Sequence, residues 1–142
     1  MLKRLTVTLA PLLLTVAACG GTSESQITPF ESIDDACFAY SAALGDFPAY
    51  TPQLTTAGLN EWAADVRVVA DRAAAIAVKT EGTDPMLYSL IKAASDGMYR
   101  AAETTEQAAQ DPSEANIKAS NQALEDGSQA IRDVTTSCTS GS

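Results

Sequence analysis

Polar–proline pairs that precede helical periodicity are the feature that most restricts the fold of this chain. Thr28-Pro29, Asp84-Pro85 and Asp111-Pro112 each come just before a stretch in which apolar residues recur every three or four positions. The polar side chain caps the first-turn amides, and proline suits the first helical position because its missing N–H would have no partner there. The sequence therefore predicts three helices that begin at these pairs.

A further helix is predicted between the first two pairs. The first helix is expected to begin at the capping box Thr28-Pro29-Phe30-Glu31 and to end at Gly45 and Pro48. The second is expected to begin near Thr56 and to end before Gly82, and its many alanines allow a neighbouring helix to approach closely. The apolar face of the first helix comprises Phe30, Ile33, Cys37, Tyr40 and Leu44.

The last predicted helix has a seven-residue repeat. A second capping box at residues 111–114 opens it, and its repeating apolar positions are Ile117, Leu124, Ile131 and Cys138, joined by Val134. This period is that of the seam in a left-handed bundle. Helices joined by such short turns run antiparallel, so the sequence predicts an all-α, up-down-up-down four-helix bundle.

The first eighteen residues have the layout of an export signal. Lys3 and Arg4 form a short basic start, residues 5–16 form an apolar core, and small residues precede Cys19. The apolar stretch is shorter than the roughly 17–25 residues that a membrane-spanning helix needs, and it contains Pro11. A signal peptide is therefore predicted over residues 1–18, in preference to a buried N-terminal helix.

The string Val16-Ala17-Ala18-Cys19-Gly20 resembles the lipobox of bacterial lipoproteins. The resemblance implies cleavage before Cys19 and attachment of diacylglycerol and further acyl chains, such as palmitate, to that residue. Two or three chains hold a protein stably at a membrane, so the implied location is the outer, extracytoplasmic face of the cell membrane. Residues 19–27 are then a flexible tether, residues 28–138 the helical domain and residues 139–142 a short polar tail. The composition, rich in alanine and threonine and poor in lysine, also resembles that of exported lipoproteins of high-GC actinobacteria.

The two remaining cysteines, Cys37 and Cys138, are expected to form a disulfide in an oxidising compartment. The bundle topology points the same way, because the fourth helix ends beside the first. The link would close a loop of about 100 residues, which the chain-entropy relation values at about 4–5 kcal/mol. A metal site or a redox pair is the competing interpretation, but the chain has no histidine and no Cys-x-x-Cys motif.

Charge and missing chemistry narrow the function. Removal of residues 1–18 leaves 7 basic against 18 acidic residues, a formal charge of −11. Nucleic acid is therefore a poor partner, and any charged partner is expected to be basic. Without histidine, the usual general bases and triads are missing, and no cofactor or metal site is expected. The acidic pairs lack the ligand spacing of a calcium loop and are interpreted as solvated charges, partly paired with nearby arginines. These are Asp34-Asp35, Asp65/Asp71, Glu103/Glu106 and Glu125-Asp126, with Arg67, Arg72 and Arg100 nearby.

Three aromatic residues are candidates for contact with a partner. Phe38 lies off the apolar stripe of the first helix, and Phe47 and Tyr50 lie in the loop that follows it. They either seal that loop onto the core or form an exposed binding patch, whereas Tyr40 and Trp62 are expected to pack in the core.

The leading functional prediction is a non-enzymatic, membrane-anchored lipoprotein that acts through protein contacts at the cell envelope, as an accessory or immunity/exclusion-type factor. The alternative is a carrier or sensor of a small apolar ligand, which a cavity lined by alanines of the second and third helices would favour and a filled core would disfavour. An enzyme would need a site built from carboxylates alone and comes third.

Overall fold

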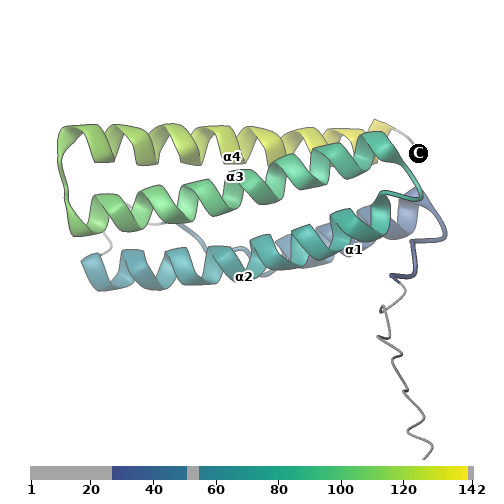
Figure 1. The fold of residues 1–142 in the computed structure, drawn as a ribbon, viewed down its shortest axis with the longest axis horizontal. Coiled ribbons are helices and arrows are strands. Elements are labelled where there is room, and N and C mark those ends of the chain that lie inside the picture. Colours follow the sequence, from purple (N-terminus) through teal and green to yellow (C-terminus); the bar gives the residue numbers. More distant parts are fainter. Residues whose placement is uncertain (1–26, 51–54, 141–142) are drawn as a thin grey trace, which may run out of the picture.

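Four α-helices form the part of the chain that the computed structural model describes, residues 27–50 and 55–140 (Figure 1). They are α1 (Ile33–Leu44), α2 (Thr56–Thr80), α3 (Pro85–Gln110) and α4 (Glu114–Ser140). The helices pack in the order α1, α2, α3, α4, and α1 also contacts α4, which confirms the predicted four-helix bundle. The predicted signal peptide, Cys19 and all but the last residue of the predicted tether lie outside the described residues.

The first helix is much shorter than the other three, and this shapes the bundle. It has 12 residues, whereas α2, α3 and α4 have 25 to 27. It therefore lies along only one half of the bundle, near the C-terminal end of α4 (Figure 1). Over part of the other half, the residues that follow α1 take its place, because Phe47 and Tyr50 pack against Trp62 of α2.

The predicted starts of α2 and α3 are confirmed by their caps. Thr55 accepts a hydrogen bond from the amide of Gly58 at the start of α2. The carboxylate of Asp84 accepts from the amide of Leu87 at 2.8 Å, and Pro85 is the first residue of α3. Both helices thus begin where a short polar side chain can satisfy a first-turn amide.

The predicted start of the first helix is wrong by four residues. The helix begins at Ile33, where the Ser32 side chain accepts a hydrogen bond from the Asp35 amide at 3.1 Å. The backbone of Phe30 is used elsewhere, because its amide donates to the Lys79 carbonyl and its carbonyl accepts from the Thr83 hydroxyl. The segment before α1 is therefore held on the turn between α2 and α3, and Ser32 is the first cap available to the helix.

The fourth helix also begins later than predicted. The amide of Asn116 donates to the Ser113 hydroxyl at 3.4 Å, so Ser113 is the capping residue. Asp111 instead ends α3, and its backbone and side-chain oxygens accept from the Asn116 side-chain amide. At the other end, α4 continues through Ser140 and includes the first two residues of the predicted polar tail.

Alanines form the seam between α2 and α3, as the sequence predicts. The hydroxyl of Ser95 donates to the carbonyl of Ala70 at 2.9 Å, which requires the two backbones to lie close together. Small side chains permit this approach, and larger residues fill the remaining core. The buried alanines are Ala63, Ala70, Ala73 and Ala77 of α2 with Ala94, Ala101 and Ala102 of α3, and the larger residues include Trp62, Leu87, Ile91 and Met98.

The heptad positions predicted for α4 are not its most deeply buried residues, although Leu124, Ile131 and Cys138 pack against the core. Ile117, the first heptad position, is 46% exposed, and the other three positions are only half-buried. The buried residues of α4 are instead Ser120, Ala123, Gly127 and Val134, of which three are small. The reason is the close crossing of α3 and α4, where a Cβ added at Gly97 would lie 2.9 Å from the Gly127 Cα.

Candidate functional site

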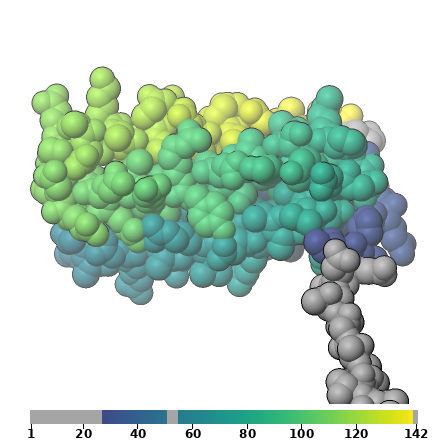
Figure 2. Space-filling model, viewed as in Figure 1, coloured from purple at the N-terminus to yellow at the C-terminus, as the bar shows by residue number. Residues whose placement is uncertain are grey.

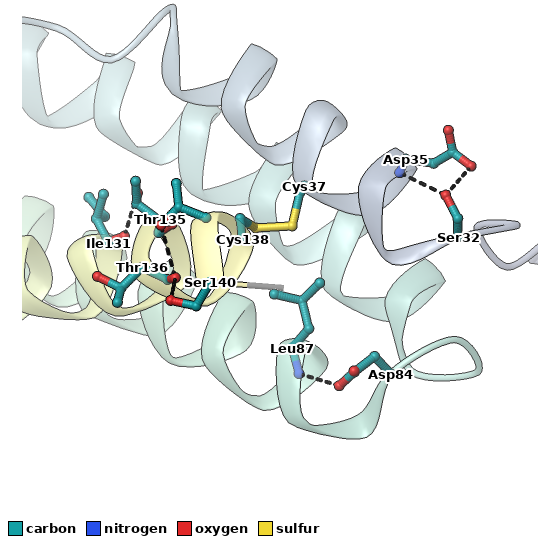
Figure 3. Close-up of a disulfide and its surroundings, with 11 residues drawn as sticks. Ser32, Asp35, Cys37, Asp84, Leu87, Ile131, Thr135, Thr136, Cys138 and Ser140 are labelled. Atoms are coloured by element: carbon teal, nitrogen blue, oxygen red, sulfur yellow. Dashed lines mark hydrogen bonds between the residues drawn. A yellow bond between two sulfur atoms is a disulfide. The ribbon is translucent and has the colours of Figure 1, made fainter. Parts of the chain in front are cut away.

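A disulfide fastens the short α1 to the end of α4 (Figure 3). Cys37 and Cys138 are bonded, with their Cα atoms 5.7 Å apart and a sequence separation of 101. This confirms the predicted pairing, which agrees with the separately predicted bundle topology. Because α1 carries Phe38 next to Cys37, the disulfide also fixes the position of the most exposed aromatic side chain described here.

The inner face of α1 is narrow. Ala36, Tyr40 and Ala43 are its buried residues, and Tyr40 is 2% exposed. Burial raises the pKa of the Tyr40 phenol, and its hydroxyl has no hydrogen-bond partner within the described ranges. The half-buried Cys37 and Leu44 also pack against the core, so the docking of α1 on the bundle depends on few large side chains and on the disulfide.

The structure separates the three aromatic residues that the sequence singled out. Phe47 and Tyr50 make edge-to-face contacts with the Trp62 ring, at centroid distances of 6.5 and 5.2 Å. The Trp62 indole N–H donates to the Pro48 carbonyl at 3.2 Å, so the loop after α1 is sealed onto the core. Tyr50 remains 41% exposed. The sealing interpretation thus describes Phe47 and Tyr50, and Phe38 does not take part.

Phe38 instead projects from the outer side of α1 and is 79% exposed. One turn further along the helix, Ala42 lines an open groove of about 410 Å³ between α1 and α2. Sequence reasoning missed this groove: Ala39 and Ala42 fall off the main apolar stripe of α1, but small residues there do not show how far away α2 lies. Its lining comprises Ala39, Ala42, Ala43, Arg72, Ala75 and Ile76.

The seam between α2 and α3 is filled by the helices themselves. Its central alanines, including Ala73 and Ala94, have no exposed surface. A groove of about 150 Å³ does lie beside this seam, but it is open to the surface and bordered by the ion pair between Lys92 and Asp96, 2.7 Å apart. Typical ligand pockets measure about 300–1,000 Å³ and enclose most of their ligand. This geometry counts against a ligand held between α2 and α3.

Two arginines of α2 pair with other elements rather than with their sequence neighbours. Arg67 makes a bidentate ion pair with Glu106 of α3, with Nη2 and Oε2 2.6 Å apart. Arg72 pairs with Asp46, which follows α1. The expectation that these arginines pair with Asp65 and Asp71 is wrong, because residues one or two positions apart point to different sides of a helix. Asp71 accepts a hydrogen bond from Tyr99 instead.

Two of these pairings shift a pKa from its ordinary value. The hydrogen bond from Arg67 lowers the pKa of the Glu106 carboxyl, and that from Tyr99 to Asp71 raises the pKa of the phenol to about 12. Tyr99 borders the open groove beside the α2–α3 seam, and Glu106 is held by Arg67, so we interpret both hydrogen bonds as structural contacts.

No known protein helps to interpret these surfaces. The chain matches no protein-family model, and no curated protein and no solved structure is detectably similar to it. Within residues 27–50 and 55–140, no helix is long and apolar enough to cross a membrane, and no three His, Cys, Asp or Glu side chains gather in a way that could hold a metal ion.

Proposed function

We propose that this protein is a membrane-anchored lipoprotein, held at the outer face of the cell membrane by lipid on Cys19, which acts through contacts with another protein of the cell envelope. Its role is that of an accessory or immunity/exclusion-type factor, and not that of an enzyme. The lipobox-like string before Cys19 supports the anchor. The disulfide fits export to an oxidising compartment.

The observation that carries the binding role is the outer side of α1. Phe38 is 79% exposed, and an alanine-lined groove lies one helical turn away. A single exposed apolar residue is ordinary on a protein surface, but an aromatic side chain near a shallow apolar groove gives a partner an anchor and an adjoining apolar surface. The disulfide holds this surface in place through the adjacent Cys37.

Crosslinking in intact cells followed by pull-down tests this proposal. The native protein should capture one discrete protein partner, and Cys19→Ala should not, because the unanchored chain leaves the membrane. Phe38→Ser should also lose the partner. Ile117→Ser is the matched control, since Ile117 is 46% exposed and lies at the opposite end of α4 from Cys138.

Two results would contradict the proposal. Capture of the same partner by Cys19→Ala would show that the anchor is not needed for the contact. Undiminished capture by Phe38→Ser would show that the outer side of α1 is not the contact surface.

A further inference from the structure

One end of the bundle gathers the start of the described chain and the turn between α2 and α3. The amide of Phe30 donates to the Lys79 carbonyl at 3.2 Å, and the Thr83 hydroxyl donates to the Phe30 carbonyl at 2.7 Å. Pro29 lies over Gly82, where an added Cβ would be 3.4 Å from the proline ring. Figure 2 shows this arrangement, with the purple first residues against the teal residues of α2 and α3. We call residues 27–35 and 78–86 the tether end.

The tether end exposes large apolar side chains. Of the eight that are exposed in the described part of the chain, four lie here: Ile27 at 54%, Ile33 at 43%, Val78 at 45% and Met86 at 72%. Such side chains do not contribute to the core. Their concentration at one end of a small domain is typical of a contact surface.

The same end is strongly acidic. Glu31, Asp34, Asp35, Glu81 and Asp84 lie within it, and Lys79 is its only basic residue. The ammonium group of Lys79 lies over the Phe30 ring, 6.0 Å from its centroid. Because like charges repel over a distance of about 8 Å at physiological ionic strength, this end disfavours an anionic lipid surface and favours a cationic partner.

The length of chain before the tether end keeps it near the membrane. Cys19 and Ile27 are eight residues apart, so a fully extended chain would separate their Cα atoms by at most roughly 29 Å. If Cys19 carries lipid, as the proposed function states, the tether end is the part of the domain held closest to the bilayer.

We propose that the tether end is a docking surface for a basic, amphipathic segment next to the membrane in an integral membrane protein. Apolar residues of that segment cover the exposed apolar side chains of the tether end, Met86 above all, and its lysines or arginines meet the carboxylates of the same end. The inference rests on the lipid anchor of the proposed function. It goes beyond that function by naming the chemistry of the partner and a contact surface that does not include Phe38.

Site-specific photocrosslinking in living cells tests the proposal with the full-length, lipidated protein. A photoreactive amino acid is placed at position 86 and, as the matched control, at position 117, which is also exposed but lies near the start of α4. We expect an adduct from position 86 whose crosslinked peptide is rich in lysine or arginine and adjoins a membrane-spanning segment. In a second variant, Asp34→Lys with Glu81→Lys should reduce the adduct roughly tenfold, the effect of about 0.7 kcal/mol per reversed charge.

Other outcomes overturn the proposal. An adduct with lipid, no adduct, an equal adduct from position 117, or an acidic or soluble crosslinked peptide would each do so. Metabolic labelling of the same cells with an alkyne fatty acid separates the two proposals. A labelled protein without the expected adduct leaves the anchor standing and refutes only the docking surface, whereas an unlabelled protein refutes both.

Discussion

Removing the disulfide should destabilise the whole domain and release α1 first. In the variant Cys37→Ser/Cys138→Ser, the unfolded chain regains the conformational entropy that the disulfide removes by joining residues 101 positions apart. The chain-entropy relation gives this a value of about 4–5 kcal/mol, and small domains have only about 5–15 kcal/mol of stability in total. With an unfolding entropy of about 2 cal/mol/K per residue over some 110 residues, the melting temperature should fall by roughly 20 °C.

The local effect follows from how little else holds α1. The helix has 12 residues, a length at which isolated helices are marginal in water, and only Ala36, Tyr40 and Ala43 are buried. Without the disulfide, amides in residues 33–44 should exchange hydrogen much faster than those in the alanine seam of α2 and α3. The outer side of α1, with Phe38, should lose its fixed position at the same time.

Two measurements check this prediction. Urea unfolding followed by circular dichroism gives the change in the free energy of unfolding, and hydrogen exchange read by mass spectrometry gives the local opening. Ser41→Ala, an exposed change one turn from Cys37, is the control and should alter neither quantity by more than about 0.5 kcal/mol. A loss below about 1 kcal/mol with unchanged exchange in α1 would refute the reasoning, because packing alone would then hold the helix.

Three further predictions concern packing and charge, and all are read from urea unfolding. Gly97→Ala should lower the free energy of unfolding by about 1 kcal/mol, because overpacking against the α4 backbone outweighs the gain in helix propensity. The control Ala93→Gly, at an exposed position of the same helix, measures that propensity. A Gly97→Ala variant more stable than the native protein would contradict the close crossing. Tyr40→Phe should leave stability unchanged or raise it by about 1 kcal/mol, because it removes a buried hydroxyl without a partner, and a loss of similar size would show that the hydroxyl is satisfied. Glu106→Gln should lower stability by about 0.5 kcal/mol at pH 7. The pKa of Glu106 is lower in the folded than in the unfolded state. The stability difference between the native protein and Glu106→Gln should therefore be complete above the ordinary glutamate pKa of about 4.3 and vanish as the pH falls below it. A stability difference that persists at pH 2.5 would argue against the ion pair.

The features predicted well from the sequence are those that local chemistry decides. Asp84-Pro85 provides both a cap and a fitting first residue, so α3 begins there whatever surrounds it. The alanine run of α2 likewise predicts a close helix contact. The pairing of Cys37 with Cys138 follows from two remaining cysteines in an oxidising compartment, and the separately predicted up-down-up-down bundle agrees with it because its first and last helices lie side by side.

The features predicted badly depend on contacts between elements. Thr28 and Glu31 match a capping box, but Phe30 between them gives its backbone hydrogen bonds to α2 and the following turn. The heptad of large residues in α4 does not mark the helix face closest to α3, because glycines at the crossing bring the backbones together. Both the hydrogen bonds of Phe30 and the close approach of α3 and α4 depend on residues far away in the sequence, so the local sequence pattern does not indicate them.

The aromatic residues and the groove near α1 likewise depend on contacts between elements. The sequence identified Phe38, Phe47 and Tyr50 as a group, but only Phe47 and Tyr50 of the loop pack against the Trp62 ring. The groove between α1 and α2 could not be predicted, because it depends on how far apart the two helices lie.

The central claim is that Cys19 becomes a lipid-bearing N-terminus, and intact-mass analysis of the protein from bacterial membranes tests it most directly. We expect the mass of the chain from Cys19 to Ser142, less two hydrogens for the disulfide, plus diacylglycerol and any further acyl chain. Cys19→Ala should retain residues 1–18 and carry no lipid. A native protein with the mass of the unmodified chain, or cleaved at another position without lipid, would contradict the account.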